Sequence, residues 1–299
     1  MDVIKTFPDK SIDCVITSPP YWMKRDYGWS GQWGMEPTFE MYLENLWSLI
    51  SEIYRVLKDT GTVWINLADT YGTKSGNFTG GNTVKNKISY TGVMGDNYTK
   101  DLAYHKCLLL LPHRFAIGCI DRGWIMRNDI VWAKRNAMPE SVTDRCSQKH
   151  EYFFFMVKQE DYYFDLESIK DKTVTKDFNV RDRDTTKLNN TPGRTRMGGL
   201  KENNYDTKNP GSVSDFWDIP TKGSTENHFA AYNTKLVDKP IMAGCPKDGI
   251  ILDPFCGTAT TGCRAIDLQR KFIGIEGKED YVKIGNKKLL PFQITQQLF

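Results

Sequence analysis

One short segment of the sequence presents groups that could hold a planar, amino-bearing molecule. Residues 17–22 read TSPPYW and follow a β-branched run, 11–16, that has the pattern of a buried strand. Prolines donate no backbone hydrogen bond and hold the preceding residue extended, so this loop should be rigid, with free carbonyls. It would present together the Ser18 hydroxyl, the Pro19 carbonyl and the Tyr21 ring. The alternative is a corner that only buries two aromatic side chains.

A second segment has the layout of a nucleoside-binding βαβ unit. Residues 249–262 read as a buried strand followed by a loop of small residues, and a helix continues through 263–266. Another strand, 272–275, ends at Glu276. In such units small residues let the backbone approach the ligand, and an acid about 20 residues further on binds ribose hydroxyls.

The two segments together resemble a known enzyme family. ITSPPY at 16–21 resembles the catalytic signature of amino-group DNA methyltransferases, in the serine form associated with N4-cytosine enzymes, and DPFCG at 253–257 resembles their S-adenosylmethionine loop. The catalytic loop comes first, as in the permuted β class, and the likeness includes 139–145 and 150–152. It implies an α/β, Rossmann-like methyltransferase fold with a mostly parallel central sheet, circularly permuted motif order and an inserted target-recognition region.

The resemblance also implies roles for individual residues. The catalytic residues would be Ser18, Pro19, Pro20 and Tyr21. S-adenosyl-L-methionine would be held by Thr17, Asp253, Pro254, Phe255, Gly257, Thr258, Ala259, Thr260, Glu276 and His228. DNA would be contacted by Ser141, Arg145, His150, Lys172, Arg181, Arg183, Arg194 and Arg196. Ala259 replaces the usual glycine, and the prolines that normally flank the histidine are missing around His228.

These roles suggest a mechanism. An exocyclic amine lies inside the duplex, so the base must be extruded. Tyr21 would stack on the extruded ring, while Ser18 and the Pro19 carbonyl would accept hydrogen bonds from the amino group. Glu276 would bind ribose hydroxyls, and the helix start at 257–260 would face the methionine carboxylate. The acceptor of the released proton is not identified.

The distribution of charge fits double-stranded DNA as the partner, and the spacing of the cysteines predicts that the protein binds no metal. The 299 residues carry a net charge of +3, but residues 74–205 hold 22 Lys and Arg against 16 Asp and Glu. An ordinary solvated surface, with no DNA partner, could have the same excess of positive charge in residues 74–205. The 7 cysteines are scattered, with no metal-ligand spacing and no disulfide pattern.

No signal region or membrane span is recognisable, which predicts a cytoplasmic protein of bacterial, archaeal or phage origin. A homodimer and a cognate restriction endonuclease are compatible further partners.

Hydrophobic periodicity places the elements around these motifs. A helical stripe runs over 39–58, a strand over 61–67, and a second helix over 108–122, with further strands at 125–134 and 152–158. The second helix is expected to bury the side chains Leu109, Phe115, Ile117 and Ile120. Asp69, after the strand 61–67, either lines the pocket or caps a loop.

The domain boundaries follow from composition. Residues 1–163 form the catalytic part, with a flexible loop at 72–100 that could close over DNA. Residues 164–220 are poor in aliphatic side chains and rich in Lys and Arg, which predicts the target-recognition region. Residues 221–299 form the cofactor-binding part.

Three functions remain open. The first is an N4-cytosine DNA methyltransferase, and the second is an N6-adenine enzyme of the same class, because a serine at this position does not exclude adenine. The third is a DNA-binding protein with a degenerate cofactor site, of which Ala259 would be a sign. A nicotinamide dehydrogenase is disfavoured because the glycine loop lacks G-x-G-x-x-G spacing. An RNA substrate also stays open.

Overall fold

A computed structural model describes residues 2–29, 31–72, 104–137, 140–170, 213–221 and 233–296. The chain divides into two compact units, Met1–Asp165 with Ser214–Phe299, and Leu166–Val213. The second unit is described only at 166–170, which include the 3₁₀ helix η2 (Glu167–Ile169), and at 213. Most of the predicted flexible loop and of the predicted target-recognition region therefore lies outside the described residues.

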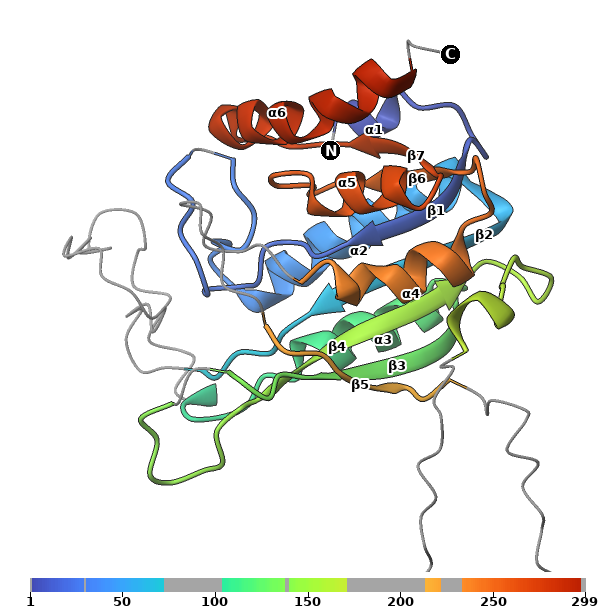
Figure 1. Ribbon diagram of the computed structural model, residues 1–299. Helices are drawn as coiled ribbons and strands as arrows, with labels where there is room; N and C mark the ends of the chain where they lie inside the picture. Colours follow the sequence, from blue (N-terminus) through green and yellow to red (C-terminus); the bar gives the residue numbers. More distant parts are fainter. Residues whose placement is uncertain are drawn as a thin grey trace, which may run out of the picture. The chain divides into compact units, whose positions relative to one another are not determined.

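The first unit is built on one seven-stranded sheet with the order β5-β3-β4-β2-β1-β6-β7 (Figure 1). All neighbouring strands pair in parallel except β4, which is antiparallel to both β2 and β3. The predicted mostly parallel sheet is confirmed. The strands are β1 (Ile12–Thr17), β2 (Leu57–Leu67), β3 (Ile125–Ala133), β4 (His150–Val157), β5 (Phe216–Asp218), β6 (Ile250–Asp253) and β7 (Lys271–Gly274).

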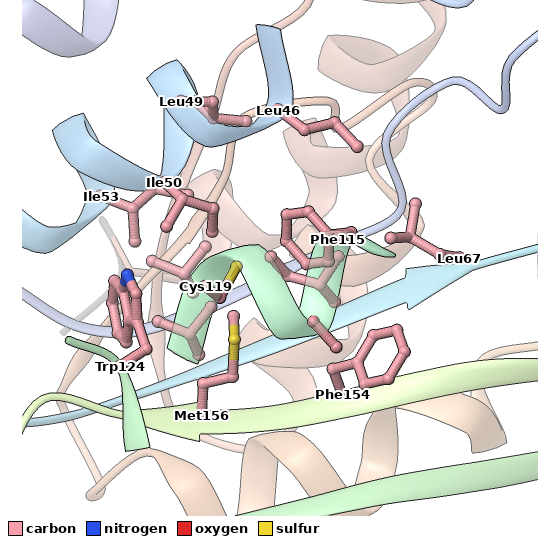
Figure 2. Packing of buried hydrophobic residues seen from close by; sticks show 14 of the residues in the cluster. Leu46, Leu49, Ile50, Ile53, Leu67, Phe115, Cys119, Trp124, Phe154 and Met156 are labelled. Carbon is pink, nitrogen blue, oxygen red and sulfur yellow. The ribbon is translucent and has the colours of Figure 1, made fainter. Parts of the chain in front are cut away.

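Helices cover both faces of the sheet, and each face has its own hydrophobic core. The helices are α1 (Asp2–Lys5), α2 (Phe39–Val56), α3 (Leu111–Asp121), α4 (Lys235–Gly244), α5 (Thr260–Asp267) and α6 (Glu279–Gln296). On one face α2 and α3 pack against β2 and β4 (Figure 2). On the other face α4 and α5 cover residues of β1, β4 and β6. No helix in the described part of the chain is both long and apolar enough to cross a membrane.

The buried face of α2 follows from its apolar spacing. Leu46, Ile50 and Ile53 recur every three or four residues and are almost fully buried. The helix begins after Thr38, whose hydroxyl accepts a hydrogen bond from the Met41 N–H at 3.3 Å and so satisfies one of the free amides of the first turn.

Strand β2 begins earlier than the sequence predicts. The expected strand covers 61–67, but the chain passes from α2 directly into β2 at Leu57, which pairs with Ile12. The register of β1 against β2 shifts between Ile12 and Cys14, and Gly61 lies within this stretch. A Cβ atom on Gly61 would lie 2.9 Å from the Asp13 carbonyl oxygen, so glycine allows this close approach instead of ending the strand.

The direction of the strands decides where a functional site can form. The carboxyl ends of β1, β2, β3, β6 and β7 and the amino end of β4 lie at one edge of the sheet. Ligands of open, mostly parallel sheets bind in the crevice outside this edge. The loops that leave these strand ends are therefore the candidate site.

Candidate active site

The two motif-bearing loops meet at this edge. Strands β1 and β6 are neighbours, with Val15 paired to Leu252. Where they end, the Thr17 hydroxyl donates a 2.7 Å hydrogen bond to Oδ1 of Asp253. The predicted adjacency of the two remote segments is thus confirmed.

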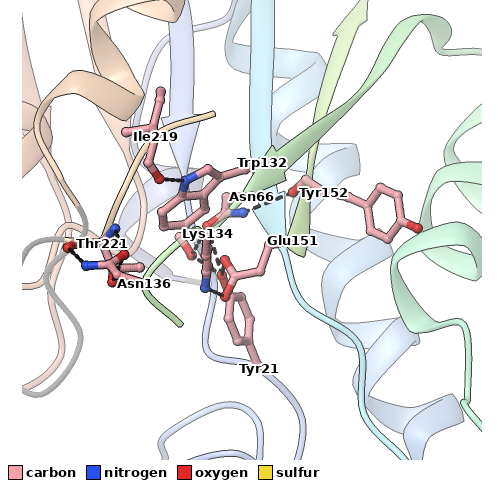
Figure 3. A network of polar contacts seen from close by, with 10 residues as sticks. Tyr21, Asn66, Trp132, Lys134, Asn136, Glu151, Tyr152, Ile219 and Thr221 are labelled. Atoms are coloured by element: carbon pink, nitrogen blue, oxygen red, sulfur yellow. Dashed lines mark hydrogen bonds and ion pairs between the residues drawn. The ribbon is translucent and has the colours of Figure 1, made fainter. Parts of the chain in front are cut away.

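A polar network fixes Tyr21 in the site (Figure 3). The Tyr21 hydroxyl lies 2.8 Å from Oδ1 of Asn66 and 2.8 Å from Oε2 of Glu151, and it can donate its single hydrogen to one of them at a time. The other Glu151 oxygen accepts from Nζ of Lys134. The Tyr21 hydroxyl is therefore held by residues of β2 and β4, and Lys134, the residue after β3, supports it through Glu151.

Ser18 joins the same network. Its Oγ lies 3.2 Å from the Tyr21 hydroxyl and 3.4 Å from Oδ1 of Asn66. The Asn66 amide nitrogen donates to the Tyr152 carbonyl at 3.0 Å, which turns Oδ1 towards Ser18 and Tyr21. The site around Ser18 is consequently rich in acceptors, as binding of an amino group requires.

The pKa of Tyr21 excludes a role for this residue as a base at neutral pH. Burial raises the pKa of the phenol well above its usual value, and the adjacent Glu151 carboxylate raises it further. Tyr21 stays protonated and acts as a hydrogen-bond donor.

The carbonyls of the two prolines differ in their surroundings. The Pro20 carbonyl accepts from the Tyr42 hydroxyl of α2 at 2.9 Å, which pins the loop to the helix. No hydrogen bond to the Pro19 carbonyl is made within the described ranges of the chain. The predicted free acceptor at Pro19 is therefore compatible with the structure.

Asp253 supports the loops from inside the protein. It is 2% exposed. One carboxylate oxygen accepts from Thr17 and from the Phe255 N–H, and the other accepts from the Thr261 hydroxyl at 2.7 Å. Burial raises the pKa of Asp253 to about 6, an effect that these hydrogen bonds only partly offset. Thr17 and Asp253 thus hold β1, the loop and α5 together.

The raised pKa predicts that Asp253 makes stability depend on pH. The folded chain binds this proton more tightly than the unfolded chain, so the stabilising contribution is complete below about pH 4 and is lost as the pH rises through 6. For Asp253→Asn, which cannot ionise, we expect the free energy of unfolding to rise relative to the native chain by about 2 to 3 kcal/mol between pH 4.5 and 8. Urea denaturation at both pH values measures the difference. The exposed Asp161→Asn is the control, and parallel pH curves for Asp253→Asn and the native chain would contradict the expectation.

Glu276, which follows β7, closes the predicted cofactor loop. Its Oε2 accepts from the Gly257 N–H at 2.9 Å and its Oε1 from the Lys278 N–H at 2.8 Å. A carboxylate has about four acceptor positions, so each oxygen can still accept a hydroxyl. The geometry suits an acid that both orders the loop and binds a diol.

Ala259 adopts a backbone conformation that glycine favours. Its φ is +59°, in the left-handed region that favours glycine. A Cβ atom at Gly285 of α6 would come within 3.3 Å of the Ala259 methyl group, so Gly285 provides the space for this methyl. The α5 helix then begins at Thr260, where the first turn offers N–H groups that have no partner within the helix.

The other predicted residues of the cofactor loop that the structure describes are buried or half-buried. Pro254 and Thr258 are buried, and the Thr258 hydroxyl accepts from Nζ of Lys288 in α6 at 3.2 Å. Phe255 is half-buried against Trp33. His228 lies outside the described residues.

Asp69 caps a helix. Its Oδ1 accepts from the Leu111 N–H at the start of α3 and from the Thr70 N–H, at 3.1 and 2.8 Å. The sequence predicts that Asp69 either lines the pocket or caps a loop, and these two hydrogen bonds are those of a capping residue.

The predicted DNA-contacting residues that the structure describes lie beside this network, in the loop between β3 and β4 or at the start of β4. Ser141 is exposed, and Nε2 of His150 lies 3.2 Å from the Tyr152 hydroxyl. Arg145 is ion-paired to Glu140 at 2.7 Å, with its guanidinium over the Tyr71 ring. The remaining five are outside the described residues: Lys172, Arg181, Arg183, Arg194 and Arg196.

Three residues of the network were not predicted: Asn66, Lys134 and Glu151. Asn66 and Glu151 are 2% and 9% exposed. An amide near the end of an apolar strand is a sequence signal for Asn66, because buried polar groups need partners. Lys134 and Glu151 sit at the ends of two apolar strands, and only the sheet order reveals that they meet.

Among the described residues there is no cluster of His, Cys, Asp or Glu that could hold a metal ion. The seven cysteines form no disulfide. The site therefore consists of hydroxyl, amide, carboxylate and amine groups around one aromatic ring.

Comparison with known sequences identifies relatives along nearly the whole chain. A family model described as DNA methylase, for N6 and N4 methyltransferases, matches residues 12–287. Type II methyltransferase M.SmaI of Serratia marcescens is 33% identical over 292 residues, which cover 97% of this chain and 88% of M.SmaI. M.Cfr9I of Citrobacter freundii is 33% identical over 289 residues, covering 97% and 85% of the two chains.

Solved structures share the fold. The PvuII DNA methyltransferase, named as cytosine-N4-specific, matches with a TM-score of 0.62 at 18% identity, over 95% of this chain and 82% of that one. M1.HpyAVI in complex with S-adenosylmethionine matches with a TM-score of 0.55 at 18% identity, over 96% and 94%. The overall fold of this chain is thus one that known DNA methyltransferases share.

Proposed function

This chain belongs to the DNA methylase family of N6 and N4 methyltransferases, and within that family we propose that it methylates the exocyclic N4 of cytosine. It is an S-adenosyl-L-methionine-dependent enzyme that acts on DNA. The choice of cytosine rests on one observation above all. Position 18 of the catalytic signature carries a serine, the form associated with N4-cytosine enzymes, and its Oγ lies 3.2 Å from the Tyr21 hydroxyl and 3.4 Å from Oδ1 of Asn66.

Positioning of the target amine carries the proposed mechanism. The base must leave the duplex to reach a site at the edge of the sheet. Tyr21, held by Asn66 and Glu151, offers its ring as a fixed stacking surface. Ser18 and the Pro19 carbonyl accept the two amino hydrogens, which draws the nitrogen lone pair out of conjugation with the ring and towards the methyl group. Much of the rate acceleration then comes from orientation.

The cofactor side is assigned to the loop after β6 and to Glu276. S-adenosylmethionine supplies the methyl group when bound. Glu276 would accept from the ribose hydroxyls, and the N–H groups at the start of α5 would face the methionine carboxylate. The loop keeps a left-handed backbone at Ala259, and Gly285 leaves room for the alanine methyl group, which weakens the argument for a degenerate cofactor site.

The DNA side is assigned to the β3–β4 loop and to residues 164–220. Two residues near the end of β3 hold the chain that follows β5. The indole N–H of Trp132 donates a 2.7 Å hydrogen bond to the Ile219 carbonyl, and the Asn136 side chain is hydrogen-bonded to Thr221 (Figure 3). Because β5 runs parallel to β3, the chain that leaves β5 is held next to Lys134 at the edge of the sheet that carries the site. We also propose that the chain forms a homodimer and that a cognate restriction endonuclease cuts the DNA site that it methylates.

Analysis of methylated nucleosides tests the choice of base. We expect DNA incubated with the protein and S-adenosylmethionine to contain N4-methyldeoxycytidine after digestion and mass spectrometry. N6-methyldeoxyadenosine without methylcytosine would overturn the cytosine assignment and leave the amino-methyltransferase assignment intact. Single-molecule sequencing of DNA from a host that expresses the chain would identify the modified base and its recognition site together.

A further inference from the structure

An aromatic strap runs from the catalytic loop across the cofactor loops. We define it as residues 22–29 and 31–36, which directly follow Tyr21. Its first part is anchored beside the catalytic loop, because the Trp22 carbonyl accepts from the Thr70 hydroxyl at 3.1 Å and the Met23 N–H donates to the Gly34 carbonyl at 2.8 Å. The strap thus begins at the place assigned to the base.

Its middle contacts the loops assigned to the cofactor. The Tyr27 carbonyl accepts from Nζ of Lys278 at 2.9 Å, two residues after Glu276. The Trp33 ring packs edge to face on Phe255, with ring centroids 5.2 Å apart. One continuous segment therefore touches the loop after β6 and the loop after β7.

Trp29 lies directly over Gly277, the residue after Glu276. A Cβ atom on Gly277 would come within 2.4 Å of Cη2 and 2.6 Å of Cζ2 of the Trp29 ring. The edge of the indole therefore occupies the place where a side chain at position 277 would point. Residue Trp29 is nevertheless 38% exposed, so part of its surface is available to a ligand.

We propose that Trp29 forms one wall of the pocket for the adenine ring of S-adenosylmethionine. The proposal rests on the assignment of Glu276 to the ribose, because an adenine joined to that ribose must lie next to Gly277. Adenine is flat and its faces are apolar, and nucleoside sites bind such rings with aromatic or aliphatic side chains. Gly277 has no side chain to offer, and Trp29 supplies the missing surface from a remote part of the chain.

The affinity for S-adenosylhomocysteine, measured by calorimetry on the full chain, tests this role. Stacking of an aromatic side chain on a base typically changes affinity by about 5- to 150-fold on alanine substitution. We therefore expect Trp29→Ala to raise the Kd by roughly 10- to 100-fold and Trp29→Phe to stay within about threefold of the native chain. Phe216→Ala is the matched control, since Phe216 is 57% exposed on β5, at the other end of the sheet order from β7. It should bind as the native chain does.

Two further measurements do not require the alanine variant to fold. Titration of the native chain with S-adenosylhomocysteine should change its tryptophan emission, and most of this change should be absent in Trp29→Phe. Gly277→Ala should weaken binding about as much as Trp29→Ala, because its new methyl group displaces the indole. Thermal melting of each variant shows whether it is folded.

The outcomes separate this proposal from the function it rests on. If Trp29→Ala bound S-adenosylhomocysteine with native affinity, or if Trp29→Phe and Trp29→Ala lost equal affinity, Trp29 would not be an aromatic wall of the pocket. The assignment of Glu276 to the ribose would still stand in either case, provided that Glu276→Ala bound the ligand more weakly than the native chain. Absence of binding heat in the native chain, with and without DNA, would instead contradict the cofactor site itself.

Discussion

Replacing Tyr21 by alanine is expected to lower kcat/KM for DNA methylation by roughly 30- to 300-fold, because the extruded base loses its stacking surface. The stacking term alone is typically about 1–3 kcal/mol per base. Alanine also leaves the acceptors of Asn66 and Glu151 without the hydroxyl that lies 2.8 Å from each. Initial rates with radiolabelled S-adenosylmethionine measure the effect, and calorimetry should show little change in cofactor affinity.

Tyr21→Phe separates the ring from the hydroxyl. Phenylalanine keeps the stacking surface and loses only the hydrogen bond of the hydroxyl, so the expected loss is smaller than that of Tyr21→Ala. Tyr54→Ala is the control, since Tyr54 packs on Trp124, which precedes β3 at the opposite edge of the sheet. If Tyr21→Ala retained the native rate, Tyr21 could not be the stacking residue.

The local elements around the motifs could be predicted because their apolar spacing is unambiguous. The strand before residue 17, the helix over 39–58 and the strand before Asp253 all exist, each ending within a few residues of its expected limit. Two parallel strands that each end in a functional loop bring those loops to the same edge. The sequence therefore suffices to predict that the segments ending at Thr17 and Asp253 meet.

Other features depend on which elements pack together. Spacing along α3 predicts Ile117 and Ile120 to be buried with Phe115, and this is wrong: they are 59% and 50% exposed. Only one side of α3 packs on α2 and the sheet, and periodicity does not give the width of that contact. Similarly, Glu151 meets Tyr21 only because β4 runs antiparallel between β2 and β3.

The contact of Trp29 with Gly277 is the least predictable feature. The two residues are far apart in the sequence, and neither belongs to a helix or strand. Their contact depends on the path of the strap, which is fixed by single hydrogen bonds such as that from Lys278 to Tyr27. Loops of this kind have no periodic signal, so their position follows only from the folded chain.

Replacing Glu276 by alanine is expected to raise the Kd for S-adenosylmethionine by about 10- to 100-fold while kcat at saturating cofactor changes little. Hydrogen bonds to a charged group are typically worth about 1.5–3 kcal/mol, and a ribose diol would lose its acceptors. The variant also frees the N–H groups of Gly257 and Lys278, which Glu276 holds at 2.9 and 2.8 Å, so the loop loses part of its order. Calorimetry gives the affinity, and methylation rates over a range of cofactor concentrations give KM and kcat separately.

Two variants distinguish the direct contact with ribose from the ordering of the loop. Glu276→Gln keeps one carbonyl oxygen and loses the charge, so its Kd should lie between those of the native chain and Glu276→Ala. Glu279→Ala removes a carboxylate that is 82% exposed in the first turn of α6 and is paired with Lys283, and it should bind the cofactor normally. A ligand without the 2′- and 3′-hydroxyls, 2′,3′-dideoxyadenosylhomocysteine, would bind the native chain and Glu276→Ala with similar affinity if the carboxylate acts on the diol. If the dideoxy ligand instead loses as much affinity on Glu276→Ala as the natural ligand does, the carboxylate acts through Gly257 and the loop, and the ribose assignment is wrong.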